Sequence, residues 1–132
     1  MIEIVDFIER IETYTRNMTY DDFVKDAKTI DAVDANIRKV GEAVRVLSKH
    51  RSVKELFYRF RIPYRDLSEM RTDLTHEYFT VNKDSVWKTA TTLIDIKPQF
   101  KKVMEALGQP HAESAARKAT NSYPKEQEKT ES

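Results

Sequence analysis

Apolar residues recur every three or four positions along most of the chain, which is the spacing of one face of an α-helix. The most regular run lies in residues 30–47, where steps of three and four alternate as in the seam of a helical bundle. A second run in residues 2–18 has charged residues between its apolar positions. The apolar positions are Ile4, Phe7, Ile8, Ile11, Tyr14 and Met18 in one run, and Ile30, Val33, Ile37, Val40, Val44 and Leu47 in the other. Both runs predict amphipathic core helices.

Capping and helix-breaking residues divide the rest of the chain into shorter helices. Thr19 is the predicted N-cap of a short helix through Ala27, and Ile62-Pro63 is a predicted break. Asn82 is the predicted N-cap of a helix that starts at Lys83. Pro98 should kink or restart that helix, and Gly108 with Pro110 should end it. After the break, Leu67, Met70 and Leu74 predict the buried stripe of a further helix.

Glycine is an unusual residue for the middle of the predicted helix in residues 30–47, because it costs roughly 1 kcal/mol relative to alanine. Gly41 shares one flank of this helix with Asp34, Arg38 and Arg45. Ordinary helix packing and close approach of a helix from a second chain both account for it.

Composition fits these helices and limits the other possibilities. The chain has 132 residues, 39% of them hydrophobic, and only two glycines, so we expect one all-α domain with a modest core. We assign residues 1–108 to an up-and-down bundle of four to five main helices, and the polar residues 109–132 to a flexible tail. There is no cysteine and no run long and apolar enough for a membrane span, so we expect a soluble, cytoplasmic protein.

Charge gives little sign of nucleic-acid binding by the protein as a whole. The net charge is +1, so any contact with RNA has to be local or shared with a partner. Residues 50–61 are both basic and aromatic, which suits contact with phosphates and bases. The same pattern also fits a short connecting helix that buries Leu56, Phe57 and Phe60, and this is the more common case.

The candidate chemistry lies in residues 71–79, with Arg71, His76 and Tyr78 inside eight positions. On an ideal helix Arg71 and Tyr78 fall beside the stripe of Leu67 and Leu74, while His76 lies about 140° from its centre. His76 therefore points away from the core of its own chain. Arg71 and His76 diverge by a similar angle, so a site that uses both needs the long arginine to reach round or residues from a second chain.

Other catalytic motifs are absent from the sequence. It contains no glycine-rich phosphate loop, no His-Glu-x-x-His zinc motif, no calcium loop and no Gly-x-Ser-x-Gly elbow. With no histidine and carboxylate cluster at ligand spacing, we expect neither a metal nor a cofactor. What remains is acid–base chemistry by Arg71 and His76.

The run Arg71-x-x-x-x-His76-x-Tyr78 resembles the signature of the HepT toxins, a branch of the HEPN ribonucleases. The resemblance spans roughly residues 2–107 and includes the flanking segments Gly41-Glu42-Ala43, Ile62-Pro63-Tyr64-Arg65-Asp66 and Val86-Trp87. Two positions depart from the family pattern. Thr72 stands where asparagine is usual, and Tyr64 stands where tryptophan is common.

The resemblance implies a homodimeric helical bundle that cuts RNA, such as tRNA or mRNA, without metal in a cleft shared by two chains. Arg71 and His76 would be catalytic, and Thr72, Asp73 and Glu42 would support them. The resemblance also implies an MntA-type nucleotidyltransferase antitoxin that transfers AMP to Tyr78. Two rivals stay open at this point: a non-catalytic module that binds the nucleotidyltransferase or presents its substrate, which Thr72 favours, and a plain structural dimer.

Overall fold

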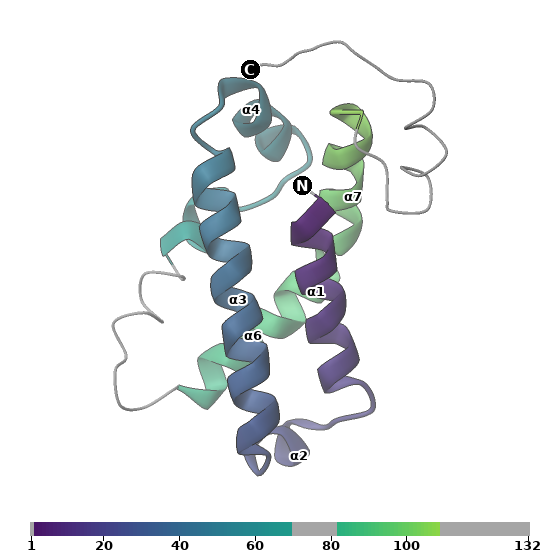
Figure 1. Ribbon diagram of the computed structural model, residues 1–132, viewed down its shortest axis with the longest axis vertical. Coiled ribbons are helices and arrows are strands. Elements are labelled where there is room, and N and C mark those ends of the chain that lie inside the picture. The colour runs from purple at the N-terminus through teal and green to yellow at the C-terminus, as the bar shows by residue number, and fades with distance from the viewer. Residues whose placement is uncertain (1, 70–81, 109–132) are drawn as a thin grey trace.

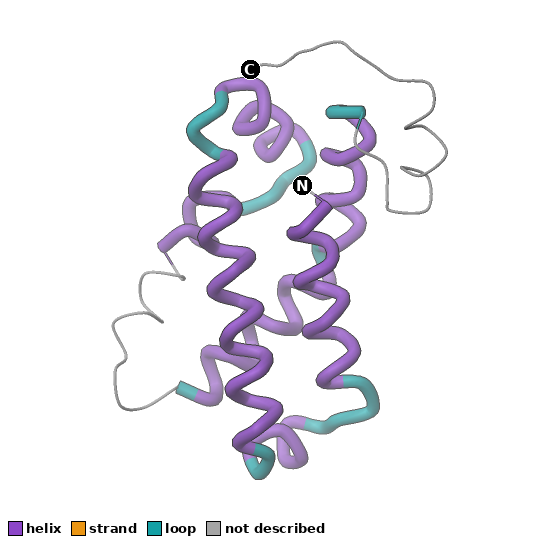
Figure 2. The backbone as a smooth tube through the Cα atoms, in the orientation of Figure 1, coloured by secondary structure: helices purple, strands orange, loops and turns teal. Residues whose placement is uncertain are grey.

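A computed structural model describes residues 2–69 and 82–108, and every regular element in these ranges is helical (Figure 1 and Figure 2). This confirms the predicted all-α class. The elements are α1 (Ile2–Thr15), α2 (Tyr20–Val24), α3 (Ala27–Leu47), α4 (Arg51–Arg59), α6 (Lys83–Asp95) and α7 (Lys97–Ala106), with a further helical segment at 64–69. The predicted dimer lies beyond a single chain, and the predicted tail at 109–132 lies outside the described residues.

The long helices α1 and α3 run antiparallel, side by side, and form the largest helix pair of the bundle (Figure 1). Helix α6 crosses behind them and packs on both, and α7 packs on α1 and α4. The short helices α2 and α4 lie at opposite ends of the bundle (Figure 1). The largest fully buried side chains include Phe23 near one end and Phe57 and Phe100 near the other, so the core extends along the whole bundle.

Helix α3 follows its predicted seam closely, because five of its six apolar seam positions are buried and Leu47 is partly buried against the core. Helix α1 differs from its prediction at two positions. Tyr14 is 41% exposed, whereas Val5, which lies off the predicted stripe, is fully buried. The helix ends at Thr15, and Asn17 takes a left-handed conformation at φ 64°, so Met18 packs against the core from outside the helix.

Helix capping explains where the short helices begin and end. Thr19 forms the predicted N-cap of α2 as a capping box with Asp22. The short helix stops at Val24 and does not run through Ala27 as predicted, because Asp26 caps the next helix: its Oδ1 accepts a hydrogen bond from the Thr29 amide at 3.0 Å. The tight succession of two caps leaves no room for a longer α2.

The predicted signals near the C-terminal helices are confirmed. Asn82 caps α6, with its Oδ1 accepting from the Ser85 amide at 3.1 Å. Helix α6 ends at Asp95, and α7 restarts with Pro98 in its first turn, where the missing amide hydrogen costs nothing. Gly108 closes α7 in the left-handed conformation at φ 74°, which favours glycine.

Candidate functional site

The residues predicted to carry the chemistry lie outside the described part of the chain. They are Arg71, Thr72, Asp73, His76 and Tyr78, all within residues 70–81. Their predicted roles therefore stay predictions. Glu42 is the one predicted site residue that the structure describes.

The described segments on either side of the motif are parts of the helical bundle. Residues 64–69 are helical, and Leu67 is buried at 4% exposure, as the predicted stripe requires. Helix α6 begins directly after Asn82. In Figure 1 both flanks, the segment at 64–69 and the start of α6, lie on the side of α3 away from α1.

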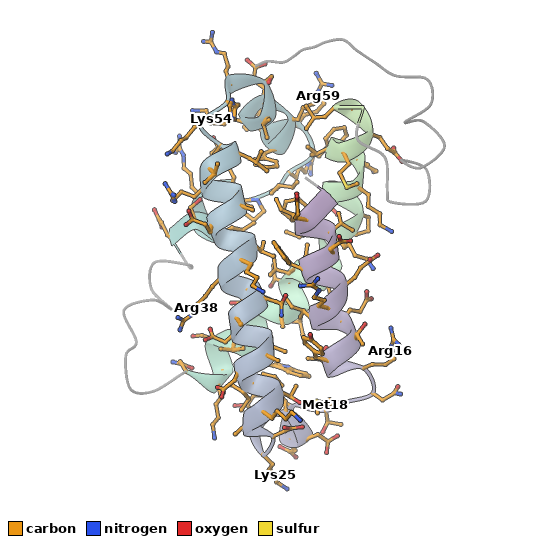
Figure 3. All side chains as sticks on the ribbon, in the orientation of Figure 1. Arg16, Met18, Lys25, Arg38, Lys54 and Arg59 are labelled. Carbon is orange, nitrogen blue, oxygen red and sulfur yellow. The ribbon has the colours of Figure 1, made fainter. Side chains whose placement is uncertain are left out.

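Helix α3 presents a polar pair on the same side. Asp34 is buried and pairs with Arg38, whose Nη2 lies 3.0 Å from Asp34 Oδ2. Burial raises the pKa of Asp34 from its ordinary value, and the positive charge of Arg38 offsets this only in part. Figure 3 shows Arg38 projecting from α3 on the side away from α1. In this view, a buried carboxylate and a guanidinium thus lie on the same side of α3 as the flanks of the motif.

Glu42 lies one turn further along α3 and is half exposed. Its carboxylate accepts two hydrogen bonds from the guanidinium of Arg45, at 3.2 Å from Nε and 2.6 Å from Nη2. These contacts raise the pKa of Arg45. The neighbouring Gly41 is buried in mid-helix, as a position of close packing requires. Glu42 is thus held in a forked ion pair on α3.

A second polar feature lies at the α4 end, where the chain leaves α4 and enters the segment at 64–69. Residues on this turn line a hollow of about 540 Å³, which we call the basic hollow; they are Tyr58, Arg59, Arg61, Ile62, Pro63 and Tyr64. Arg59 and Arg61 are exposed, and neither forms an ion pair within the described residues. Tyr58 is 80% exposed.

The turn below the basic hollow has a defined backbone conformation. The amide of Arg61 donates to the carbonyl of Tyr58 at 3.1 Å, and the amide of Ile62 donates to the carbonyl of Phe57 at 2.8 Å. This is the hydrogen-bond pattern of a Schellman motif, with buried Phe57 and Ile62 as its apolar contact. Arg61 occupies its left-handed position at φ 61°, where glycine is usual. The composition of residues 50–61 indicated a basic and aromatic surface, but no signal in the sequence indicated this conformation.

Residues 50–61 form the predicted connecting helix, and contact of their exposed face with RNA stays a prediction. Phe57 is fully buried and Leu56 and Phe60 are partly buried, as expected of a connecting helix. The opposite face carries exposed Tyr58 and Arg59. Burial of one face and exposure of the other are compatible, because α4 is amphipathic.

The described residues form neither a metal cluster nor a membrane-spanning helix. In the ranges 2–69 and 82–108, no three histidine, cysteine or acidic side chains gather as a metal site would need. Within the same ranges, no helix combines the length and apolar character needed to cross a membrane.

Fold and site together define a small helical-bundle protein that carries a polar flank on its longest helix and a basic hollow at one end. Comparison with known proteins narrows this class. The chain belongs to the ribonuclease HepT-like family, whose model matches residues 4–107.

The names of similar proteins support the assignment to this family. A protein of Methanocaldococcus jannaschii named "Putative RNase MJ1216" is 32% identical over 106 residues, which cover 80% of this chain and 84% of the relative. A protein of Thermococcus cleftensis named "Probable ribonuclease HepT" is 35% identical over 104 residues, covering 76% of this chain and 89% of the relative. No solved structure matches. The resemblance to HepT in the sequence is thereby confirmed.

Proposed function

We propose that this protein is a metal-independent endoribonuclease toxin that acts as a homodimer and is paired with an MntA-type nucleotidyltransferase antitoxin. One observation carries the proposal: the chain is a HepT-like ribonuclease, and the match at residues 4–107 includes Arg71, His76 and Tyr78. The candidate substrates are tRNA and mRNA.

The proposed chemistry is attack of the RNA 2′-hydroxyl on the adjacent phosphorus. The hydroxyl loses its proton to an imidazole, the new O2′–P bond forms, and the bond from phosphorus to the 5′-oxygen breaks. The departing 5′-oxygen takes up a proton and becomes a hydroxyl. The other RNA fragment ends in a 2′,3′-cyclic phosphate. Histidine suits both proton transfers because its ordinary pKa is about 6.5. General acid–base catalysis of this kind raises a reaction rate by roughly 10²–10⁴-fold. The guanidinium of Arg71 would stabilise the charge on the phosphorane.

Two chains are needed in this mechanism because one histidine cannot be acid and base in the same step. His76 is predicted to face away from its own core, and a two-fold cleft would bring two copies of it to one phosphate. The described structure is compatible with such a cleft, since both flanks of the motif lie on the outer side of α3 (Figure 1). Glu42 and Arg38 lie on the same helix and are candidates for supporting contacts.

Modification of Tyr78 would explain the control of the toxin. AMP on this phenol adds bulk and a negative phosphate two residues from His76. That charge would compete with the RNA phosphate for Arg71. A nucleotidyltransferase that joins the Tyr78 oxygen to the α-phosphorus of ATP, with release of pyrophosphate, would switch the nuclease off.

Cleavage of RNA in EDTA by variants of the motif tests the nuclease. We expect Arg71→Ala and His76→Ala to lower the rate at least 100-fold, because each removes a catalytic group. His50→Ala is the matched control for the histidine, since His50 is exposed and makes no side-chain hydrogen bond at the start of α4. Arg16→Ala is the control for the arginine, because Arg16 is an exposed arginine outside the motif, near the α2 end of the bundle (Figure 3). Motif variants that are folded and as active as wild type would refute the proposal.

The rival is a non-catalytic module that binds the nucleotidyltransferase, and Thr72 in place of the usual asparagine favours it. It predicts no cleavage by any form of the protein. Intact mass separates the remaining cases. Incubation with the nucleotidyltransferase and ATP should add one AMP unit to wild type and none to Tyr78→Phe, whereas a plain structural dimer gains no mass at all.

A further inference from the structure

We infer that the basic hollow is a subsite for single-stranded RNA, in which Arg59 and Arg61 bind a backbone phosphate and Tyr58 stacks on a base. This deepens the proposed nuclease function and rests on it, because it adds a second contact to the same substrate. The inference comes from four features of the α4 end: two arginines without an ion pair in the described residues, an exposed aromatic ring, a strained backbone position and closeness to the motif.

The first feature is an excess of positive charge around the basic hollow. Residues 49–66 contain six lysines and arginines but only two acidic residues, whereas the whole chain has a net charge of +1. Arg59 and Arg61 line the hollow without an ion pair in the described part of the chain. Elsewhere in that part, Arg38 and Arg45 pair with carboxylates on α3. Unpaired guanidinium groups in a concave surface suit a phosphate, which they bind through two parallel hydrogen bonds.

The second feature is the arrangement of the aromatic rings. Tyr64 already stacks on Phe57, with ring centroids 6.1 Å apart and planes at 30°, and the Arg65 guanidinium lies 5.9 Å from its centroid. Tyr58 contributes no such ring contact within the described residues and is 80% exposed. An exposed ring beside arginines is how proteins hold single-stranded RNA, since every base can stack on it.

The third feature is the residue that holds the left-handed position of the Schellman motif. Glycine takes this conformation freely, whereas a residue with a Cβ pays a cost there. Asn17, the other non-glycine residue with positive φ in the described ranges, has a short polar side chain that tolerates it. Arginine has no such advantage. The fold alone would favour glycine at position 61, so this position points to a role for the guanidinium beyond folding.

The fourth feature is the distance along the chain to the predicted catalytic residues. Tyr64 closes the hollow and is seven residues before Arg71. Seven residues span at most about 25 Å even when fully extended. The hollow therefore lies within a few nucleotides of Arg71 whatever path residues 70–81 take. A strand held in the hollow can reach the catalytic residues without a partner protein to bridge the gap.

Binding of a 2′-O-methyl RNA oligonucleotide to the full chain tests the subsite, because this RNA has no 2′-hydroxyl to attack. We expect Tyr58→Ala to weaken binding about 5- to 100-fold with no change in its salt dependence. We expect Arg61→Gly to weaken binding and to lower the slope of log affinity against log salt by about 0.7, which is the loss of one phosphate contact. The thermal midpoint of Arg61→Gly should equal or exceed that of wild type, because glycine relieves the left-handed position.

Two variants at the other end of the bundle are the controls. Asn17→Gly makes the same backbone change at φ 64°, and Arg16→Ala removes one exposed cation. Both should bind the RNA within about twofold of wild type. If Arg61→Gly loses thermal stability together with affinity, its role is structural and the inference is wrong.

Parallel cleavage of the unmodified oligonucleotide separates the two proposals. If wild type does not cleave it in EDTA, the nuclease proposal fails. If wild type cleaves it while Tyr58→Ala and Arg61→Gly bind RNA like wild type, only the subsite fails. If these variants keep their affinity for RNA and lose it for the nucleotidyltransferase, the hollow is a protein-docking surface and the subsite is again refuted.

Discussion

The two ends of the bundle use their polar side chains in different ways. At the α2 end, these groups bind one another. The Tyr20 hydroxyl donates to the Asp84 carboxylate, which raises the pKa of Tyr20, and the Lys83 ammonium donates to the Val24 carbonyl at 3.2 Å. Thr19 and Asp26 cap the two neighbouring helices. The polar chemistry of this end serves the fold.

At the α4 end, the two arginines of the basic hollow have no partners of this kind. Arg59 and Arg61 form no ion pair within the described ranges, whereas Arg51, outside the hollow, lies 3.9 Å from Glu55. This end is held together by apolar contacts beneath the surface, chiefly Phe57 against Phe100 and Ile62. The difference indicates that substitutions at the α2 surface should change stability, whereas substitutions in the basic hollow should change RNA binding.

Truncation of one buried phenylalanine at each end of the bundle should cause the largest losses of stability. Phe23→Ala and Phe57→Ala should each cost about 3–5 kcal/mol of unfolding free energy, because both rings are fully buried. Urea unfolding measures this cost. Phe57→Ala should also weaken RNA binding at temperatures where it is folded, since Phe57 supports the turn under the hollow. Equal RNA binding by the two variants would remove the functional distinction between the ends.

A smaller effect is expected from the helix cap at the α2 end. Hydrogen bonds from the Thr29 amide and hydroxyl lower the pKa of Asp26 below its ordinary value of 3.8. A lowered pKa in the folded state stabilises the fold above pH 3.8, and this stabilisation is lost as the pH falls through the folded-state value. Asp26→Ala should therefore lower the thermal midpoint by roughly 4–8 °C at pH 7.

The same variant has a clear signature in its pH dependence. The gap in thermal midpoint between wild type and Asp26→Ala should close as the pH is lowered from 5 towards 2. RNA binding at pH 7 should not change, because Asp26 lies at the end remote from the basic hollow. A gap that persists at low pH would mean that Asp26 acts through packing and not through its charge.

The sequence predicted the parts of the fold in which one local signal determines the outcome. The α3 seam, the caps at Thr19 and Asn82, and the restart at Pro98 are such signals. The error at Tyr14 has a physical reason. A 3.6-residue period leaves the edges of a buried stripe undecided, and Tyr14 lies at such an edge one residue before α1 ends.

For the candidate site, the sequence predicted the residue types that could carry the chemistry but not the shape of the surface around them. Arg71 and His76 stand out because their residue types suit acid–base chemistry at this spacing. The basic hollow could not be predicted, although Tyr58 and Arg59 were recognised as part of a basic and aromatic run. Its shape depends on the left-handed backbone of Arg61 and on the contact of Phe57 with Ile62 across a helix end. Neither follows from a local propensity, because arginine ordinarily avoids that conformation.

The smallest effect should come from Arg51, which shares α4 with the hollow but lies outside its lining. Its side chain is 91% exposed, and its Nε is 3.9 Å from Glu55, too far for a strong ion pair. Arg51→Ala should leave the thermal midpoint within about 1 °C and RNA affinity within about twofold. Thermal unfolding measures the midpoint, and binding of the 2′-O-methyl oligonucleotide measures the affinity. If Arg51→Ala weakens RNA binding as much as Arg61→Gly does, the α4 end attracts RNA by its overall charge, and the shape of the hollow adds nothing.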